Sequence, residues 1–339
     1  MIKTLYIGQF SKGTTSRMRG EVIKDLLKPD SFQVIDTHVP FYNTPRVYRS
    51  IGFRYKVGPL IANVNSYIKK HIDGYYDLIW VDKGIFIDAK TTQELRKSAK
   101  TFIYYTPDMS FFENKSQHFL SSIDFYDTII YTKSRETEYY KKYVSASKLK
   151  WVSQGFSETI HKKYHGFEEK DDDVVFIGLA EKSRFEMIST LLEDGVKVKL
   201  VGKGWSSFVK NYENHENLQF LGESILDSEY SKLISSSKMA LGLLSKRFPE
   251  LHTTRTLEIP ACGTALLTEK NEEICRIFDD HEVVFFKDKE DLVCKIKYYL
   301  SPENHNKLFA VMENGFNKVW VGGYSYKSII SNILEKIEL

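Results

Sequence analysis

The segment PELHTTRTLEIPACGTALLTE, residues 249–269, places two carboxylates on either side of a cation. Glu250 and Glu258 stand eight positions apart, and Arg255 lies between them. Each carboxylate oxygen can accept a hydrogen bond from a sugar hydroxyl, and a guanidinium matches the oxygens of a phosphate. These residue types favour a ligand that joins sugar to phosphate. Both glutamates also fit a simpler interpretation, as surface residues near a helix start.

The same segment predicts the element that positions these side chains. Thr253 or Thr254 is a suitable N-cap for a short helix over about 255–262, and Gly263 is a suitable stop. Pro260 removes one backbone donor, so the helix is expected to be short or kinked. One glutamate then lies in the helix and the other in the loop before it, where both can face one ligand.

A second candidate site is FIGLAEKSR, residues 176–184, where a strand-like run passes through a glycine into a helix-like segment. Gly178 permits a tight turn, and the N-terminus of the following helix offers free N–H groups. Lys182 and Arg184 add positive charge at the same point. Together these features predict a cradle for a diphosphate, although a strand, glycine, loop and helix are also plain architecture.

A third candidate is LVGKGWSSF, residues 200–208. Gly202 and Gly204 allow a ligand to approach the backbone closely. Trp205 could offer an aromatic face to a base or a sugar, and it fits a buried core position equally well.

The N-terminal loop GQFSKGTTSRMRGE, residues 8–21, departs from two common nucleotide-binding motifs. The glycine spacing from Gly8 onward is not G-x-G-x-x-G, and the loop lacks the Gly-Lys-Ser/Thr of a P-loop. Dehydrogenase and P-loop NTPase functions therefore lose support. With Arg17 and Arg19, this loop could instead receive an anion or an acceptor group.

Asp82, Lys83 and Asp108 follow strand-like runs in the N-terminal half. An aspartate at such a place could act as the general base of an inverting reaction. Asp108 fits equally well as a turn residue after Pro107.

The stretch RVYRSIGFRYK, residues 46–56, interleaves four cations with aromatic residues. It could bind an acidic glycan, a lipid-linked acceptor or an anionic membrane surface. A solvated amphipathic segment is the simplest interpretation.

Strand-like and helix-like segments alternate along the chain, which predicts β-α-β units and parallel sheets. Strand-like runs cover 4–10, 76–82, 101–107, 126–132 and 148–154, and then 174–180, 197–204, 218–222, 238–244, 264–269 and 282–286. Helix-like segments cover 16–27 and 183–195. Because both halves open with strand, glycine, loop and helix, we expect an α/β protein with two Rossmann-like domains.

The charged stretch EEKDDD, residues 168–173, is expected to be part of a link between the domains. We therefore place an N-terminal domain at 1–160 and a C-terminal domain at 161–325. The apolar spacing of the last residues predicts a helix at 326–339, and the sequence leaves open which domain it packs on.

Composition narrows the classes of partner. Residues 1–150 contain 24 Lys and Arg against 15 Asp and Glu, and residues 151–339 contain 24 against 30. The basic half favours an anionic partner, such as a membrane surface bound peripherally, or it is simply a solvated surface. The total charge of only +3, without a nucleic-acid motif, argues against nucleic acid as a partner.

The location of the protein is predicted from its cysteines and its apolar runs. Three cysteines without metal spacing are typical of a reduced, cytoplasmic protein. No apolar run approaches the roughly 18 residues that span a bilayer. The N-terminus fits a first strand rather than a signal peptide.

Several blocks of the second half resemble glycosyltransferases. Glu250 and Glu258, with seven residues between them, resemble the E-x7-E element of retaining GT-B enzymes, and LEIPACG resembles their Leu-Glu-x-x-Ala-x-Gly helix. The second half also resembles the CgeB-like branch of the glycosyl transferases group 1, named for a spore maturation protein, over about 174–330. The blocks are TTRTLEIPACGTALLTE, NEEICRIFDDHEVVFFKDKEDLVCKIKYYL and VVFIGLAEKSRFEMISTLLEDGVKVKLVGKGW.

The resemblance implies a GT-B fold, with two Rossmann-like domains facing across a cleft. The C-terminal domain would bind a nucleotide-sugar and the N-terminal domain the acceptor. Glu258 would hold the ribose hydroxyls, and Glu250 would face the donor sugar. One departure is Leu179, which stands where many relatives have an arginine.

The candidate residues fall into three sets. The donor-binding set is Gly178, Lys182, Arg184, Gly202, Trp205, Thr254, Arg255 and Glu258, the catalytic set is Glu250, Asp108 and Lys182, and the acceptor-side set is Gly8, Arg17 and Arg19.

The expected activity is transfer of a sugar from a nucleoside-diphosphate-sugar to a hydroxyl of a glycan, a lipid-linked molecule or a protein, as in the synthesis of cell-surface polysaccharide. By the same resemblance, the reaction would be retaining and would need no metal or other cofactor. Two alternatives stay open: a non-catalytic protein that binds sugar-nucleotides or glycans, and a sugar-nucleotide epimerase of the same fold.

Overall fold

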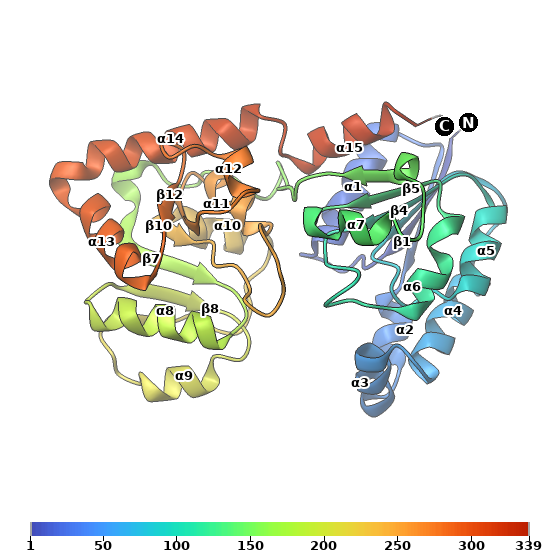
Figure 1. The fold of residues 1–339 in the computed structure, drawn as a ribbon, viewed down its shortest axis with the longest axis horizontal. Helices are drawn as coiled ribbons and strands as arrows, with labels where there is room; N and C mark the ends of the chain where they lie inside the picture. Colours follow the sequence, from blue (N-terminus) through green and yellow to red (C-terminus); the bar gives the residue numbers. More distant parts are fainter. Residues whose placement is uncertain (1, 338–339) are drawn as a thin grey trace. The chain divides into compact units, whose positions relative to one another are not determined.

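A computed structural model describes residues 2–337, and the chain divides into two compact units (Figure 1). Unit 1 takes the chain up to Ser153 and again from Tyr326, and unit 2 takes Gln154–Ser325. The predicted boundary at residue 160 therefore falls a few residues inside unit 2.

Unit 1 contains a six-stranded parallel sheet in the order β2-β1-β3-β4-β5-β6. Its strands are β1 (Lys3–Gly8), β2 (Ser31–Asp36), β3 (Tyr76–Asp82), β4 (Ala99–Thr106), β5 (Thr128–Tyr131) and β6 (Leu149–Trp151). The order changes direction between β1 and β3, which makes the carboxyl ends of these two strands the switch point of the sheet.

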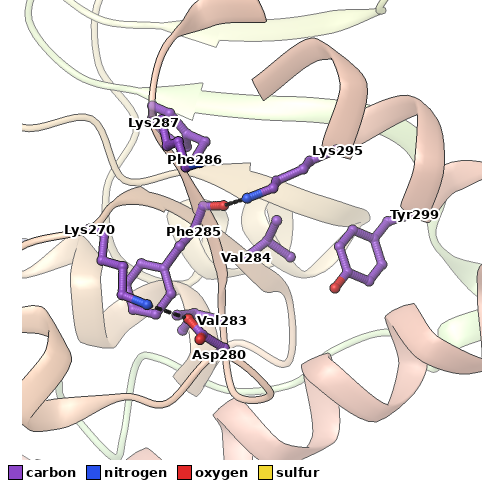
Figure 2. Close-up of a pocket in the computed structure, with 9 residues that line it drawn as sticks. All are labelled: Lys270, Asp280, Val283, Val284, Phe285, Phe286, Lys287, Lys295 and Tyr299. Atoms are coloured by element: carbon purple, nitrogen blue, oxygen red, sulfur yellow. Dashed lines mark hydrogen bonds and ion pairs between the residues drawn. The ribbon is translucent and has the colours of Figure 1, made fainter. Parts of the chain in front are cut away.

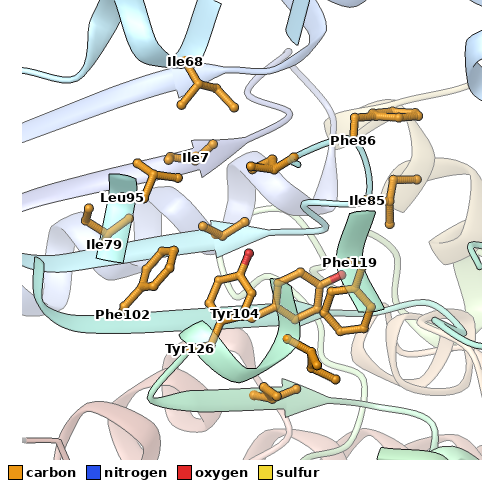
Figure 3. Packing of buried hydrophobic residues seen from close by; sticks show 14 of the residues in the cluster. Ile7, Ile68, Ile79, Ile85, Phe86, Leu95, Phe102, Tyr104, Phe119 and Tyr126 are labelled. Carbon is orange, nitrogen blue, oxygen red and sulfur yellow. The ribbon is translucent and has the colours of Figure 1, made fainter. Parts of the chain in front are cut away.

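Two layers of helices cover the sheet of unit 1. The helices are α1 (Thr15–Leu27), α2 (His38–Asn43), α3 (Arg46–Tyr55), α4 (Pro59–His71), α5 (Ala89–Lys97), α6 (Gln117–Ser122), α7 (Thr137–Tyr140) and α15 (Tyr326–Leu334). Ile7, Ile79 and Phe102 point to one face, where they pack with Ile68 of α4 and Leu95 of α5 (Figure 3).

The opposite face of the same sheet belongs to the chain's last helix. Tyr6, Trp80 and Tyr105 alternate with the residues of the first face and pack with Ile23 of α1 and with Ile330 of α15. In Figure 1 the red helix α15 lies beside the blue helix α1. The predicted terminal helix therefore completes the N-terminal unit.

Unit 2 contains a second six-stranded parallel sheet in the order β12-β11-β10-β7-β8-β9. Its strands are β7 (Asp171–Ile177), β8 (Val198–Val201), β9 (Leu218–Phe220), β10 (Ser237–Leu241), β11 (Ala265–Glu269) and β12 (Val284–Phe286). Here the order changes direction between β7 and β10, so the switch point lies at the ends of these strands.

The assignment of the acidic triplet to a linker is wrong. Strand β7 begins at Asp171, and cations of the neighbouring strands neutralise its carboxylates. Lys199 of β8 forms an ion pair with Asp171, and Lys238 of β10 lies 2.6 Å from Asp172. Three acidic residues at the start of a strand are tolerated because these partners lie across the sheet.

The helices of unit 2 also cover both faces of their sheet. They are α8 (Lys182–Glu193), α9 (Ser206–Asn211), α10 (Asp227–Ser235), α11 (Arg255–Ala261), α12 (Ile274–Ile277), α13 (Lys289–Leu300) and α14 (His305–Val321). Residues of α8, α13 and α14 pack on one face, and residues of α10, α11 and α12 pack on the other. Within residues 2–337, no helix has the length and apolar character needed to cross a membrane.

Candidate functional site

The switch point of unit 2 brings three of the predicted segments together. In open parallel sheets, ligands bind beyond the carboxyl ends of the strands where the order reverses. The loop after β7 leads into α8, the loop after β10 leads to α11, and the loop after β8 lies alongside the first of these. These three loops form the candidate site.

Two glycines let the loops after β7 and β8 touch. Gly202 has a φ of 153°, and a Cβ added there would lie 1.8 Å from the carbonyl oxygen of Gly178. The indole Nε1–H of Trp205 donates to the same oxygen at 2.8 Å. The contact between the loops therefore requires glycine at residue 202, whereas a Cβ on Gly178 would meet the ring of Phe176 at 2.8 Å.

The expectation that Trp205 offers a face to a ligand is wrong. Its side chain is 0% exposed and packs against Phe176, Phe185 and Phe208, with ring centroids 5.0–5.9 Å apart. The alternative interpretation as a core tryptophan is correct.

Arg184 ties the loop after β7 to the loop after β10. Its Nη1 donates to the carbonyl of Leu179 at 2.8 Å, and its Nη2 donates to that of Leu243 at 3.1 Å. Burial lowers the pKa of Arg184, as does the nearby charge of Arg255, while Glu250 among others opposes them. Because its side chain is buried and held by two carbonyls, Arg184 supports the crevice rather than reaching out to a ligand.

Lys182 is the exposed cation at this place. It is the first residue of α8 and lines a surface pocket of ≈ 730 Å³. Lys246 and Arg247, from the loop after β10, line the same pocket. The pocket also contains Glu181 and Glu186. Cations from two loops thus meet beside the N-terminus of a helix, where free N–H groups favour an anion.

The two basic residues after β10 were not predicted as part of the site. Lys246 and Arg247 follow the strand-like run 238–244 in an irregular segment, so their approach to Lys182 depends on the path of the loop. Lys246 also forms an ion pair with Glu269, which leaves Lys182 and Arg247 as the better candidates for contact with an anion.

The helix predicted over 255–262 is confirmed as α11. Its first residue is Arg255, and Gly263, with φ 68°, follows its end. Thr254 occupies the N-cap position without a side-chain hydrogen bond, and its carbonyl accepts the N–H groups of Leu257 and Glu258 at 2.9 Å each. The helix start is therefore held by its backbone, and the Thr254 hydroxyl has no capping role.

Glu258 lies on the inner side of α11 and is 5% exposed. The hydroxyl of Tyr230 donates to its Oε2 at 2.6 Å, and Nε2 of His161 lies 3.6 Å from its Oε1. The Nδ1 of His161 accepts the N–H of Ser157 at 2.8 Å, so a neutral ring carries its proton on the nitrogen that faces Glu258. Burial lowers the pKa of His161, which favours this neutral form.

Glu250 stands near the guanidinium groups. It is partly buried, its backbone N–H donates to Phe248 O at 2.8 Å, and its charge acts on Arg184 and opposes the lowering of that pKa. Glu250, Arg184 and Arg255 are therefore close enough to interact. The structure brings the predicted residues of this segment into one region of unit 2.

A buried histidine that the sequence did not single out anchors the loop between the two glutamates. Nδ1 of His252 lies 2.5 Å from Oε2 of Glu273, and Nε2 accepts the N–H of Gln154 at 2.9 Å. With Nε2 acting as the acceptor, the proton of a neutral ring lies on Nδ1 and points to Glu273. Both nitrogens are thus used to fix the loop that carries Glu250.

In unit 1, the expectation that Arg19 receives an acceptor is wrong. Arg19 is 1% exposed, and its Nε and Nη2 donate to the carboxylate of Asp82 at 2.7 and 3.0 Å. Its guanidinium also lies over the rings of Tyr105 and Tyr326. Arg19 and Asp82 form an internal ion pair that holds α1 to the end of β3.

Gly8 and Arg17 are better placed than Arg19 to meet a ligand, since Gly8 ends β1 at the switch point of unit 1. A Cβ on Gly8 would lie 2.9 Å from the Ser16 hydroxyl and 3.2 Å from the carbonyl oxygen of Asp82, so the end of β1 packs closely against α1 and β3. Arg17 is partly exposed and forms an ion pair with Glu21 at 3.1 Å.

Asp108 follows β4 and is paired with Lys83, which follows β3. Burial by itself raises the pKa of Asp108, but Lys83 outweighs it and holds the pKa below its usual value. The next turn is fixed by Glu136, whose carboxylate accepts the N–H groups of Ser110 and Phe111 at 2.8 and 2.7 Å. Asp108 is therefore an ionised, well-held carboxylate at the carboxyl edge of the sheet.

A second pocket of unit 2 lies beside the edge strand β12, away from the candidate site. Figure 2 shows its nine lining residues, among them Lys270, Phe285 and Lys295. Its dashed lines mark the bond of Lys270 to Asp280 at 2.9 Å and that of Lys295 to the carbonyl of Phe285. Because Lys270 and Lys295 already have partners and the pocket lies away from the switch point, we do not assign it to the site.

One group among the described residues has the spacing of metal ligands. Asp279, His281 and Glu282 have their ligand atoms within 4.8 Å of one another. Glu282 already accepts the N–H of Asp279 at 2.8 Å and lies 3.4 Å from Lys318. This group precedes β12, away from both switch points, and we assign no metal to it.

Comparison with known proteins assigns the fold. Residues 184–335 match a family model described as glycosyl transferase-like. Two solved structures each match over 99% of this chain. HepE of Anabaena in complex with UDP and glucose has 15% sequence identity and a TM-score of 0.63, and the match covers 100% of that chain. Sucrose-phosphate synthase of Thermosynechococcus elongatus has 14% sequence identity and a TM-score of 0.67, and the match covers 98% of that chain. The chain has the GT-B fold.

The GT-B neighbours are not all transferases by name. A UDP-N-acetylglucosamine 2-epimerase matches with 12% identity, a TM-score of 0.54 and 96% of that chain covered. A search of curated proteins found no match. The identities are low, so the structural likeness establishes the GT-B fold, and the family match concerns only residues 184–335.

Proposed function

We propose that this protein is a glycosyltransferase that moves a sugar from a nucleoside-diphosphate-sugar to an acceptor hydroxyl. The observation that carries the proposal is the carboxyl end of the unit 2 sheet, where Lys182 and Arg247 line one pocket and where Glu250 and Arg255 both lie near Arg184. The GT-B fold and the glycosyl transferase-like match over that part of the chain support it. Two matching HepE structures contain UDP or UDP-glucose, which makes a uridine nucleotide the first donor to test.

In this proposal, the glutamates bind hydroxyls and the cations bind the diphosphate. Oε1 of Glu258 accepts from a ribose hydroxyl, while Oε2 keeps the Tyr230 hydroxyl that fixes the carboxylate. Glu250 faces the donor sugar, and Arg255 and Lys182 face the phosphates. Arg184 holds the loop after β7 against the loop after β10.

The reaction breaks the bond between the anomeric carbon and the phosphate oxygen and forms a bond from that carbon to the acceptor oxygen. Negative charge grows on the departing diphosphate, and fixed cations with a helix N-terminus stabilise it. Lys182, Arg247 and Arg255 supply that charge, so we propose a reaction that needs no metal ion.

We propose that the anomeric configuration is retained. An inverting enzyme needs a general base matched to neutral pH, and Lys83 keeps the pKa of Asp108 low, which makes this carboxylate a weak base. In a retaining reaction, the acceptor proton can pass to the departing phosphate oxygen, and Asp108 then serves to orient an acceptor hydroxyl. The resemblance to the CgeB-like branch stays a prediction.

The first experiment screens nucleotides and then turnover. A bound nucleotide raises the melting temperature of the chain, so UDP, GDP and their sugars are compared by thermal shift. For the donor that binds, slow hydrolysis without acceptor supports a transferase, and NMR of a product formed with a simple glycoside gives the anomeric configuration. Equal turnover with and without EDTA supports a reaction without metal.

Other outcomes of this experiment favour the alternatives. Binding without hydrolysis or transfer indicates a non-catalytic binding protein. Release of a free sugar with one inverted ring centre indicates an epimerase, the activity named for one of the structural neighbours. Failure of all donors to bind contradicts the proposal.

Charge variants separate the site from general electrostatics. Lys182→Gln with Arg247→Gln removes two exposed cations of the pocket and is expected to lower turnover by about tenfold or more while leaving stability unchanged. Lys289→Gln with Lys297→Gln removes the same charge from α13 and is the matched control. Equal turnover in the two double variants would place the diphosphate elsewhere.

A further inference from the structure

The segment between β2 and α4 carries a concentration of exposed apolar side chains. Eight of the twenty large hydrophobic residues exposed in the described chain lie between residues 39 and 57, which form α2, α3 and their flanks. They are Val39, Tyr42, Val47, Tyr48, Ile51, Phe53, Tyr55 and Val57, with exposed fractions from 40% to 69%. Large exposed apolar patches mark interaction sites, and so many exposed apolar side chains in one segment point to such a site.

The same segment, residues 37–58, is uniformly basic. Arg46, Arg49 and Arg54 alternate with its apolar residues, and no Asp or Glu occurs between Asp36 and Asp73. Within residues 2–337, none of these three arginines forms an ion pair. Arg49 donates to the carbonyl of Tyr42 and lies over its ring, and Arg54 lies over the ring of Tyr55. The surface is therefore positive as well as apolar.

Helix α3 is attached to unit 1 by a small contact. Gly52 is its one buried residue, and a Cβ there would lie 2.5 Å from Cβ of Leu60 in α4. Phe53 reaches the edge of the core, with its ring centroid 6.2 Å from that of Phe86, and it is still 50% exposed. The apolar residues of α3 thus contribute little to the core of unit 1, so their exposure calls for another explanation.

We infer that residues 37–58 dock this protein onto an anionic lipid surface. Aliphatic and aromatic side chains enter the boundary between headgroups and acyl chains, tyrosines are favoured at that depth, and arginines meet lipid phosphates. A bilayer accommodates both kinds of side chain at once. We favour an anionic lipid surface because the arginines are complementary in charge to anionic headgroups and because residues 37–72 contain no acidic residue.

Other occupants fit these observations less well. An acidic polysaccharide would pair with the arginines but would leave Val47 and Ile51 in water. A second copy of the chain would bring the same positive segment against itself, because the two patches of a twofold interface are identical. These occupants are outcomes of the test below.

The inference does not rest on the donor site, because the segment belongs to unit 1 and the nucleotide-binding residues belong to unit 2. Its test uses the full chain and no sugar donor. The chain is sedimented with vesicles of phosphatidylcholine and with vesicles that contain about one third phosphatidylglycerol. We expect binding to the anionic vesicles, and weaker binding when the salt is raised from about 0.1 M to about 0.5 M.

Two triple variants test the two kinds of side chain. Val47→Ser, Tyr48→Ser and Ile51→Ser remove apolar groups that are 43–69% exposed, and Arg46→Gln, Arg49→Gln and Arg54→Gln remove charge. Each triple variant should lower the partition coefficient by about tenfold or more. Phe309→Ser with Val321→Ser, both exposed in unit 2, is the control and should bind like the parent. The far-ultraviolet circular dichroism spectrum and the midpoint of urea unfolding, measured alongside, report that each variant is folded.

The results that overturn the inference are distinct. Equal binding to neutral and anionic vesicles, or unchanged binding in both triple variants, contradicts it. Vesicle binding that falls in the arginine variant but not in the apolar variant overturns the inference that the apolar side chains enter the bilayer. Absence of vesicle binding together with a dimer that the apolar variant dissociates, seen by analytical ultracentrifugation, indicates a second copy and also overturns it.

Discussion

Gly202 lies against the carbonyl of Gly178 so closely that a Cβ on Gly202 would stand 1.8 Å from that oxygen. This contact sets the separation of the loops after β7 and β8 at the switch point. Any side chain at residue 202 must therefore push the two loops apart or change their backbone angles.

We expect Gly202→Ala to be strongly destabilising. The variant combines a steric clash with a φ of 153°, and together these should lower the free energy of unfolding of unit 2 by about 2–4 kcal/mol. Gly195→Ala is the control, because Gly195 also has a positive φ, 80°, but a Cβ there meets nothing within 4 Å. Urea unfolding followed by circular dichroism measures both, and equal losses would show that the contact with Gly178 does not matter.

Glu258→Gln should weaken nucleotide binding if Glu258 holds the ribose. A hydrogen bond to a charged group contributes about 1.5–3 kcal/mol, so the affinity for the nucleoside diphosphate should fall by about ten- to a hundredfold. Titration calorimetry with the free nucleoside diphosphate gives this directly.

Two companion variants divide the roles of the site. Tyr230→Phe removes the hydroxyl that fixes Oε2 but leaves the carboxylate, and it should cost less affinity than Glu258→Gln. Glu250→Gln should leave the affinity for the nucleoside diphosphate unchanged and weaken binding of the nucleotide-sugar. If Tyr230→Phe and Glu258→Gln were equally damaging, Glu258 would act through its internal bond and not through a ligand.

The buried ion pair of Arg19 and Asp82 should make a large contribution to the free energy of unfolding of unit 1. Asp82→Asn leaves the Arg19 charge buried without its counter-ion and is expected to cost about 3–5 kcal/mol. The double variant Arg19→Met with Asp82→Leu should recover much of that loss. Arg17→Gln breaks an exposed pair on the same helix and should cost under about 1 kcal/mol. Similar midpoints of urea unfolding for Asp82→Asn and Arg17→Gln would contradict this.

Lys170 gives unit 2 a pH dependence of known sign. Burial lowers its pKa from 10.5 to about 7, and its Nζ donates to Thr264 Oγ1 at 3.2 Å and to the carbonyl of Ser235. Between these two pKa values the unfolded chain binds more protons than the folded one. The free energy of unfolding should therefore rise with pH from about 7 toward 10.5, by about 1 kcal/mol per pH unit, and this contribution is lowest below pH 7.

Lys170→Met should remove this rise. Urea unfolding is measured from pH 6 to about pH 10 for the parent, for Lys170→Met and for Lys210→Met, which changes an exposed lysine of the same unit. The difference between the parent and Lys170→Met should shift steadily in favour of the parent as the pH increases. Parallel curves for the two proteins would contradict the assignment.

Strand positions could be predicted where burial on both faces left a continuous apolar run. YDLIWVD matches β3 residue for residue, because six of its seven side chains are buried. SFQVID was missed, because β2 is an edge strand with one buried residue and its apolar signal is weak. The acidic start of β7 was missed for a different reason: Lys199 and Lys238 become its partners only when the sheet has formed.

The turns and the helix of the candidate site could be predicted from the sequence, but the exposure of its side chains could not. The glycines and helix α11 followed from local rules for turns and caps. Whether a cation or an indole is exposed depends on tertiary packing: Trp205 and Arg184 turned inward, and Lys182 stayed outside. His161 and Tyr230 lie far from Glu258 in the sequence, so their contacts with it had no local signal.

The return of the chain to unit 1 at Tyr326 has a consequence for its biosynthesis. As the polypeptide leaves the ribosome, the first 153 residues emerge early, but the sheet face that carries Tyr6 and Trp80 cannot be fully covered until helix α15 is translated. Unit 2 is continuous and can fold during elongation, whereas the domain that begins first must finish last.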